Sequence, residues 1–295
     1  MTERHIQAAI ASNIGLRRKN NQDSGMAENG VYLVCDGMGG GVGGQRASAS
    51  AVARLRDLAA MPFRSRADIE NVLAQAQHDV LAIGDELHGV SGTTVTGLIS
   101  PHALTEGAER EPGMWYVINI GDSRTYHLDR DENGAWDAST ISHVTKDHSK
   151  RQEAIDSGTM LPEVAEATIP RNIITQCIGD PEGIRPDFYA VEPDGRFIIC
   201  SDGLHGEVDD DTIASIAAVN REPQAAVDAL IAAALDAGGT DNVTVIVADI
   251  TNEDDSTLLP WHASKLAEGE DLESVSDETL DALRIQTTFD HAQEH

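Results

Sequence analysis

The chain has 295 residues and carries 50 Asp plus Glu against 21 Lys plus Arg, a formal net charge of −29. A surface this acidic repels nucleic acid and anionic membranes, so neither is expected as a partner. Hydrophobic residues make up 40% of the chain, which is enough for a buried core and excludes a wholly disordered protein.

Short apolar segments bounded by Gly, Asp or Asn predict strands, and longer Ala-rich segments with helical spacing predict helices. In chain order we expect strands over 6–12 and 31–35, helices over 46–60 and 67–87, strands over 93–99, 114–120, 125–128, 184–191 and 196–200, helices over 211–219 and 223–237, and a strand over 243–250. Because these elements do not alternate regularly, a doubly wound parallel sheet is disfavoured. The clustering predicts a layered α+β domain.

The composition changes after residue 250. Residues 251–295 hold 12 acidic side chains and two basic ones, Lys265 and Arg284, which gives this segment a net charge of −10. Its apolar residues are sparse apart from one short helix expected over 277–285. We therefore interpret 1–250 as the folded domain and 251–295 as an acidic, partly disordered tail.

The cysteines predict a reducing compartment. Cys35, Cys177 and Cys200 form no CxxC pair, and each lies beside apolar residues. Such thiols are typical of buried free cysteines and not of a zinc site or a catalytic pair. No apolar run reaches the roughly 18 residues of a membrane-spanning helix, and the N-terminus lacks a signal-peptide core. The expected location is cytoplasmic.

An aspartate beside Gly, Ser or Asn recurs where an apolar strand ends or begins. These residues are Asp36, Asp122, Asp202 and Asp241. Any one of them is explained as a turn residue, but four can converge, and converging carboxylates repel unless a cation neutralises them. Oxygen ligands without Cys or paired His select Mg²⁺, Mn²⁺ or Ca²⁺. The pattern favours a two-metal hydrolytic site, with Gly37 allowing a close backbone approach.

Two further motifs lie near the first of these aspartates. The basic triplet 17–19 is either a solvated turn or a phosphate clamp, because arginine binds phosphate with paired hydrogen bonds. The glycines of 39–44 satisfy GxGxxG, which also suggests a dinucleotide site and an oxidoreductase. A helix and not a strand is expected after the helix that follows, so a turn beside Asp36 is favoured over a βαβ unit.

Taken in order, these segments resemble the metal-dependent protein phosphatase family, type 2C, and especially its bacterial members. The matching stretches are GLRRKNNQDS, VCDGMGGGVGGQRAS, SGTTVTG, NIGDSRTY, VTKDHS with EAIDSGTM, RNIITQCIG, CSDGLHGEV and GGTDNVTVIVAD. The resemblance extends over about residues 10–250. It implies a four-layer α-β-β-α sandwich of two antiparallel sheets flanked by helices, with 1–250 as the catalytic domain.

The resemblance also implies a metal set of Mn²⁺ or Mg²⁺. Asp36 would bridge two cations, the Gly37 carbonyl would be a further ligand, and Asp202 and Asp241 would complete the set. Asp122 matches a residue of a third, weaker metal site in bacterial relatives.

Other roles implied by the resemblance lie around these ligands. Asp23 and Gln22 would hold metal-bound waters, and Arg18 would bind the phosphate. The segment between Asp147 and Ile178 would be a flap that influences substrate choice.

The implied activity is hydrolysis of phosphoserine and phosphothreonine in proteins by a water activated between two divalent cations. The expected protein is a monomeric signalling hydrolase that acts on targets of a serine/threonine kinase. A catalytically weak relative that only binds phosphoproteins is the alternative, and the unaltered aspartates disfavour it. The sequence departs from the family at Gly41 and Gln45, where bacterial relatives carry His and Glu. Met38 replaces the general-acid histidine of some eukaryotic members.

His148 and His205 are candidates for the general acid by location only. For each of them a structural role is the favoured interpretation.

Overall fold

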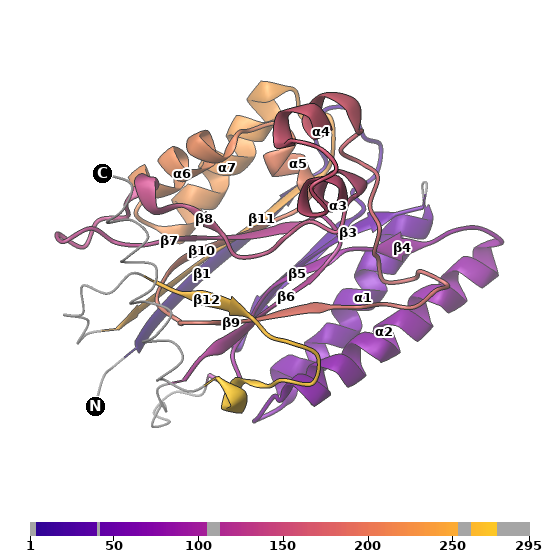
Figure 1. The fold of residues 1–295 in the computed structure, drawn as a ribbon, viewed down its shortest axis with the longest axis horizontal. Coiled ribbons are helices and arrows are strands. Elements are labelled where there is room, and N and C mark those ends of the chain that lie inside the picture. Colours follow the sequence, from indigo (N-terminus) through magenta and orange to yellow (C-terminus); the bar gives the residue numbers. More distant parts are fainter. Residues whose placement is uncertain (1–3, 40–41, 105–112, 253–260, 276–295) are drawn as a thin grey trace.

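Two antiparallel β-sheets pack face to face, and helices cover the outer face of each sheet (Figure 1). The computed structural model describes residues 4–39, 42–104, 113–252 and 261–275. The α+β class and the four-layer α-β-β-α sandwich expected from the sequence are confirmed. Within these ranges, no helix is both long and apolar enough to cross a membrane.

The first sheet contains five strands in the order β1-β11-β10-β7-β8. The strands are β1 (Arg4–Asn13), β7 (Arg124–Leu128), β8 (Ser142–His143), β10 (Gly195–Cys200) and β11 (Val243–Asn252). Helices α6 (Asp210–Val219) and α7 (Pro223–Ala237) cover its outer face (Figure 1). Strands β1 and β11 pair along their whole length, from Arg4 opposite Asn252 to Asn13 opposite Val243. This pairing brings the segment after Asn13 beside the segment that precedes Val243.

The second sheet has seven strands, in the order β12-β9-β6-β5-β3-β2 with β4 paired to β3. The strands are β2 (Asp23–Glu28), β3 (Val31–Met38), β4 (Gly92–Thr93), β5 (Val95–Ile99), β6 (Trp115–Ile120), β9 (Asp187–Val191) and β12 (Ala263–Lys265). Helices α1 (Val42–Ala60) and α2 (Arg66–Leu87) cover it. Helix α2 begins with a capping box in which Ser65 and Asp68 bond each other's backbone amides.

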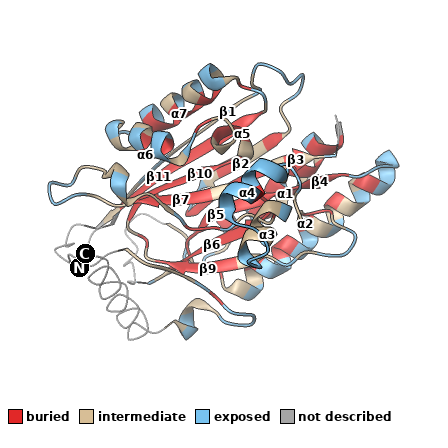
Figure 2. Cartoon of the chain, turned by 45° about the horizontal axis from the view of Figure 1, so that its top comes forward, coloured by how far each residue is buried: buried red, intermediate tan, exposed pale blue. Residues whose placement is uncertain are grey.

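The central strands are buried on both faces, which explains their continuous apolar runs. In β3, Leu33 and Cys35 pack against the helix layer, whereas Tyr32 and Val34 pack between the two sheets. A third core lies between the five-stranded sheet and helices α6 and α7. Figure 2 shows the strands buried between helices whose outer faces are exposed. Cys35 and Cys200 are buried free thiols as expected, and Cys177 is partly buried.

Several elements were not predicted because they are short or polar. They are β2, β8, β12, α3 (Lys150–Asp156), α4 (Pro162–Thr168), α5 (Asp202–His205), and the 3₁₀ turns Ala138–Thr140 and Leu272–Ser274. Helices α3 and α4 lie on the outside of the sandwich with mostly exposed surfaces (Figure 2). The strand predicted over 184–191 begins only at Asp187, because Pro186 has no N–H for the ladder.

The boundary placed after residue 250 is wrong for residues 261–275. Strand β12 extends the seven-stranded sheet by pairing with β9, and Leu266 is buried in the core. A three-residue strand carries too little pattern to be seen in an acidic segment. The helix expected over 277–285 lies outside the described residues.

Candidate active site

Strand pairing places the first two aspartates of the site side by side. In the β2–β3 ladder Asp23 is opposite Asp36. The main chain of Asp36 is held by two threonines, since its N–H donates to Thr94 Oγ1 at 2.9 Å and its carbonyl accepts from Thr94 N at 2.9 Å and Thr93 Oγ1 at 3.0 Å. The strand predicted over 93–99 is therefore interrupted at Thr94, which separates β4 from β5. The reason is that the backbone and side chain of Thr94 bond to Asp36.

Asp202 begins helix α5, two residues after strand β10 ends at Cys200. The residue before it, Ser201, donates its hydroxyl proton to Asp23 Oδ2 at 2.7 Å and accepts the N–H of Thr244 at 2.9 Å. The carboxyl group of Asp202 is close enough to that of Asp36 to raise its pKa by repulsion. Strands of both sheets thus deliver carboxylates to the same end of the sandwich.

Asp241 lies in the segment that precedes β11 and faces the loop that follows β1. Arg18 from that loop places Nη2 2.5 Å from Asp241 Oδ2. The loop is held by Asn242, whose Nδ2 donates to the carbonyls of Ile14 at 2.8 Å and Asn20 at 3.0 Å. Asn242 Oδ1 also accepts the N–H of Gln22 at 2.8 Å. The amide of Asn242 therefore fixes the position of Arg18 relative to the aspartates.

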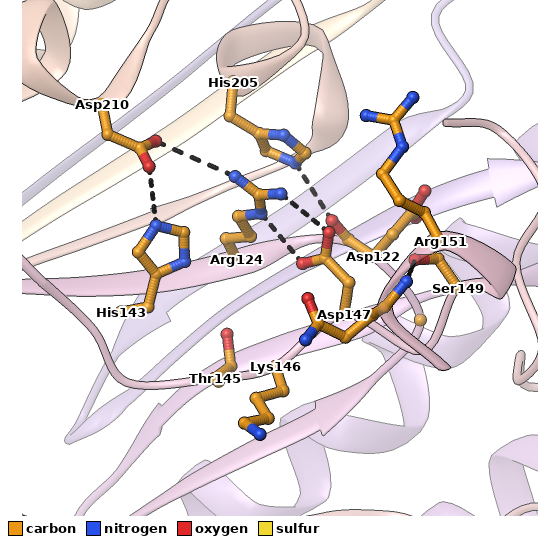
Figure 3. A network of polar contacts seen from close by, with 12 residues as sticks. Asp122, Arg124, His143, Thr145, Lys146, Asp147, Ser149, Arg151, His205 and Asp210 are labelled. Carbon is orange, nitrogen blue, oxygen red and sulfur yellow. Dashed lines mark hydrogen bonds and ion pairs between the residues drawn. The ribbon is translucent and has the colours of Figure 1, made fainter. Parts of the chain in front are cut away.

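Asp122 lies in the turn between β6 and β7, and only 7% of its surface is exposed. His205 of α5 places Nε2 3.0 Å from the Asp122 carbonyl (Figure 3). Burial lowers the pKa of His205 to about 3, so the ring is neutral and donates Nε2–H to that carbonyl. This turn is therefore connected to the helix that begins with Asp202.

Burial and mutual repulsion perturb the site carboxyl groups. Burial raises the pKa of Asp23 to about 7, against hydrogen bonds from Ser201 and Thr244, and Asp202 and Asp241 raise it further. Burial also raises the pKa of Asp122 to about 7, with Asp202 contributing. The pKa of Asp36 is raised well above its ordinary value by burial and then by Asp23 and Asp202.

Asp202 completes this set, because burial and Asp241 raise its pKa. Aspartates from five separate segments of the chain therefore act on one another.

The donor set suits a hard divalent cation. Asp23 Oδ1 and Asp202 Oδ1 are buried without a hydrogen-bond partner, which is costly unless an ion or water satisfies them. Every candidate ligand is an oxygen, as Mg²⁺ and Mn²⁺ prefer. In the positions they hold, no three Asp, Glu, His or Cys side chains of the described residues enclose a single ion, and Asp241 is paired with Arg18. A cation would thus have to draw these carboxylates together.

Comparison with known proteins identifies the family. No protein-family model matches the chain. The serine/threonine protein phosphatase PstP of Mycobacterium tuberculosis is 32% identical over 278 residues, which cover 90% of this chain and 49% of PstP. The chain thus spans about half the length of that relative. The structure of MsPP, a PPM Ser-Thr phosphatase from Mycobacterium smegmatis in complex with cacodylate, matches with a TM-score of 0.68 and 33% identity over 82% of this chain and 97% of MsPP.

The chain belongs to the PPM family, the type 2C serine/threonine phosphatases. The catalytic domain of PstP, solved in complex with two manganese ions, matches this PPM chain with a TM-score of 0.70 and 28% identity. That match covers 84% of this chain and 100% of the PstP chain. The family resemblance read from the sequence is confirmed.

In this PPM chain Gly37 and Gly44 let helix α1 pack against the end of β3. A Cβ on Gly37 would lie 2.1 Å from the Gly44 carbonyl oxygen, and one on Gly44 would lie 2.1 Å from Gln22 Nε2. Helix α1 already begins at Val42, inside the run. The glycines therefore allow a close approach of backbones beside Asp36, as the turn interpretation expected, and the helix is followed by α2.

The segment between Asp147 and Ile178, here called the flap, carries α3 and α4 and is attached at both ends. Ile178 exchanges two backbone hydrogen bonds with Thr93 of β4. Arg171 donates from Nη1 to the Gly206 carbonyl at the end of α5, and its charge opposes the rise in the pKa of Asp202. A groove of about 780 Å³ runs beside α3, lined by side chains that include Lys146, His148, Arg185, Asp187 and Lys265.

Neither candidate general acid has a free ring. His148 Nδ1 accepts the N–H of Gly121 at 3.3 Å, and its Nε2 lies 3.3 Å from Asp187 Oδ2. His205 is neutral and donates to the Asp122 carbonyl. The structural interpretation of both histidines is therefore favoured.

Sequence reasoning missed the residues that hold the site aspartates and the segments beside them in place. They are Thr94, Arg124, Ser201 and Asn242. Each lies next to, or within two residues of, a motif aspartate or in the SGTTVTG stretch. Their position in the sequence, close to the motif aspartates, was the available signal. The residues that most of them contact lie far away in the sequence.

Proposed function

We propose that this chain hydrolyses phosphoserine and phosphothreonine in proteins, and that it depends on Mn²⁺ or Mg²⁺. The observation that carries the proposal is the cluster of buried aspartates, two of which leave an unpartnered oxygen at one end of the sandwich. Buried carboxylates of this kind are stable as anions only beside positive charge. Support also comes from PstP, whose catalytic domain was solved with two manganese ions.

Within this proposal the residues that would hold two cations are Asp36, Asp202, Asp241 and the Gly37 carbonyl. Asp23 and Gln22 would contribute through water, and Asp122 would belong to a third, weaker site. When bound, the cations would lower the pKa of water and polarise the phosphoryl group. Because Asp241 is paired with Arg18, it would be free to hold a cation only after it releases that guanidinium.

Arg18 is then free to bind the phosphoryl oxygens with parallel hydrogen bonds. Its loop is already held by Asn242, so little ordering is needed when the substrate arrives. Ser201 keeps Asp23 in place, and Thr94 keeps the backbone of Asp36 in place. Burial of Asp23 and Asp122 excludes bulk water from their carboxyl groups.

The wider setting of the activity is part of the same proposal. The substrate would be a phosphoprotein modified by a serine/threonine kinase, and the enzyme would act as a monomer in cytoplasmic signalling. Residues 1–250 together with the docked segment 261–275 would form the catalytic unit.

A phosphothreonine peptide assay with the purified chain tests the proposal. We expect phosphate release with Mn²⁺ or Mg²⁺, none in EDTA, and a loss of at least about a thousandfold in Asp36→Asn and Asp202→Asn. Full activity in EDTA would contradict the metal requirement. Peptide binding without turnover in the metal-loaded protein would instead support a phosphoprotein-binding relative.

A further inference from the structure

A charged network lies behind Asp122 and joins three elements of the fold (Figure 3). Arg124 opens strand β7, two residues after Asp122. Its guanidinium donates from Nε and Nη2 to the two oxygens of Asp147, each at 2.8 Å. The two side chains are 22% and 14% exposed, so solvent screens this pair little. Paired donation of this kind fixes both distance and orientation.

The partner of Arg124 is the first residue of the flap. Residues 147–149, here called the flap root, are bonded on both sides. The N–H of His148 donates to the Gly121 carbonyl at 2.8 Å, next to Asp122. The His148 carbonyl accepts the N–H of Thr175 at 2.8 Å, from the segment by which the flap returns. The flap root therefore connects the Asp122 turn with both ends of the flap.

The other side of the guanidinium is held by the five-stranded sheet and helix α6. Nη1 of Arg124 lies 3.2 Å from the Tyr126 hydroxyl and 3.8 Å from Asp210 Oδ1. Asp210 in turn accepts from the Tyr126 hydroxyl at 2.9 Å. It also accepts from His143 Nε2 at 2.7 Å (Figure 3). Arg124 is thus held in place by contacts other than the one with Asp147. The ion pair therefore orients Asp147 more than it orients Arg124.

We propose that Arg124 is a positioning residue that fastens the flap root to the Asp122 turn, so that the flap and the aspartate cluster are held in one register. The part that concerns catalysis rests on the proposed phosphatase function. Two contacts connect the flap root with the Asp122 turn and β7. One is the ion pair between Arg124 and Asp147, and the other is the backbone hydrogen bond between His148 and Gly121. Without it, we expect the flap to open locally while the sandwich stays folded.

Amide hydrogen exchange on the full chain tests the fastening without any need for catalysis. In Arg124→Gln and in Asp147→Asn we expect the amides of His148 and Thr175 to exchange at least about tenfold faster, while the amide of Ile246 in β11 keeps its protection. If the pair is the cause, the double variant should show the same acceleration as either single variant. Additive effects, or acceleration spread evenly over the fold, would overturn the proposal.

A matched control lies close to the same strand. Arg130 pairs with Asp194 at 3.3 Å just beyond the other end of β7, with similar exposures of 26% and 20%. Arg130→Gln should leave the exchange of His148 and Thr175 unchanged. Arg124→Lys keeps the charge but loses the paired donation, so it should give an intermediate acceleration. Should Arg124→Gln fail to fold, Asp147→Asn and Arg124→Lys carry the same test.

A second readout separates this proposal from the proposed function. If the chain is a phosphatase, the Arg124 and Asp147 variants should raise KM for a phosphothreonine peptide about tenfold and change KM for a small aryl phosphate little, because only the peptide reaches the flap. Equal losses on both substrates would contradict positioning through the flap. If the wild type hydrolyses neither substrate, the proposed function fails and the exchange experiment still decides the role of Arg124.

Discussion

Arg18 Nη2 lies 2.5 Å from Asp241 Oδ2, so the side chain expected to bind phosphate and a side chain expected to bind a cation are partners. The pair is about half exposed on the arginine side, and such pairs contribute up to about 1 kcal/mol. Binding of both ligands would separate the pair, because phosphate would bind Arg18 and the cation would bind Asp241. Binding of the two ligands is therefore expected to be cooperative.

Arg18→Ala should move the two affinities in opposite directions. Removing the guanidinium frees Asp241 and removes a repelling charge, so Mn²⁺ affinity measured by calorimetry should rise by up to about fivefold. Affinity for inorganic phosphate should fall by about tenfold or more. Arg17→Ala removes the same charge one residue earlier and serves as the control. Equal effects of both substitutions would mean that only net charge matters.

Asn242→Asp should loosen the loop that carries Arg18. The substitution keeps the shape of the side chain but replaces the amide donors to Ile14 and Asn20 with an acceptor, and leaves those carbonyls facing a carboxylate. Each lost buried hydrogen bond costs about 1–3 kcal/mol. We expect a lower melting temperature and a KM for phosphopeptide raised about tenfold, measured by calorimetry and steady-state kinetics.

Asn133→Asp makes the same chemical change in an exposed turn and should leave the melting temperature and KM unchanged. If Asn242→Asp behaves like this control, Asn242 does not position the loop.

The site could be predicted from the sequence where an aspartate directly follows a strand that is buried on both faces. Asp202 and Asp36 are the examples, because a continuous apolar run is a strong local signal, although β3 continues past Asp36 to Met38. Asp23 was reached only through the family resemblance, since β2 (DSGMAE) is too polar to be read as a strand. The contact between Ser201 and Asp23 joins residues 178 positions apart, and no local pattern reports it.

The layers of the fold could likewise be predicted from the clustering of helices and strands, whereas the order of strands could not. Strands β1 and β11 come from the two ends of the domain and pair at one edge of the five-stranded sheet. The flap helices α3 and α4 have seven residues each and are mostly exposed, so they carry no long apolar stripe. Elements of this kind are specified by their attachments and not by their own periodicity.

His127 should make the protein less stable in mild acid. Its ring is buried and stacks on Trp261 with centroids 3.6 Å apart, while Nε2 donates to the Asp194 carbonyl at 2.9 Å. Burial lowers its pKa to about 3, against about 6.5 in the unfolded chain. The unfolded chain therefore binds a proton first as the pH falls below about 6.5, and stability falls until the pH reaches about 3. At pH 5 the loss from this group relative to pH 7.5 is about 2 kcal/mol.

His127→Gln keeps an N–H donor near the Asp194 carbonyl and cannot titrate. Urea unfolding at pH 7.5 and pH 5 measures the difference. The wild type should lose about 2 kcal/mol more than the variant between these values, and other titrating groups cancel in the comparison. The same pH dependence in both proteins would mean that His127 is not the group responsible.

Leu266→Ala tests whether residues 261–275 are part of the folded unit or an appendage. Leu266 is 5% exposed and its N–H donates to the Phe188 carbonyl at 2.8 Å. Arg66 reinforces the docking by donating to the Ala267 and Glu270 carbonyls at 2.6 and 2.7 Å. Emptying this core position should cost about 2–4 kcal/mol in urea unfolding. Leu161→Ala, at a leucine that is 69% exposed on the flap, should change stability by less than about 0.5 kcal/mol. The two substitutions remove the same atoms. Equal losses in the free energy of unfolding would therefore mean that residues 261–275 are an appendage and not part of the folded unit.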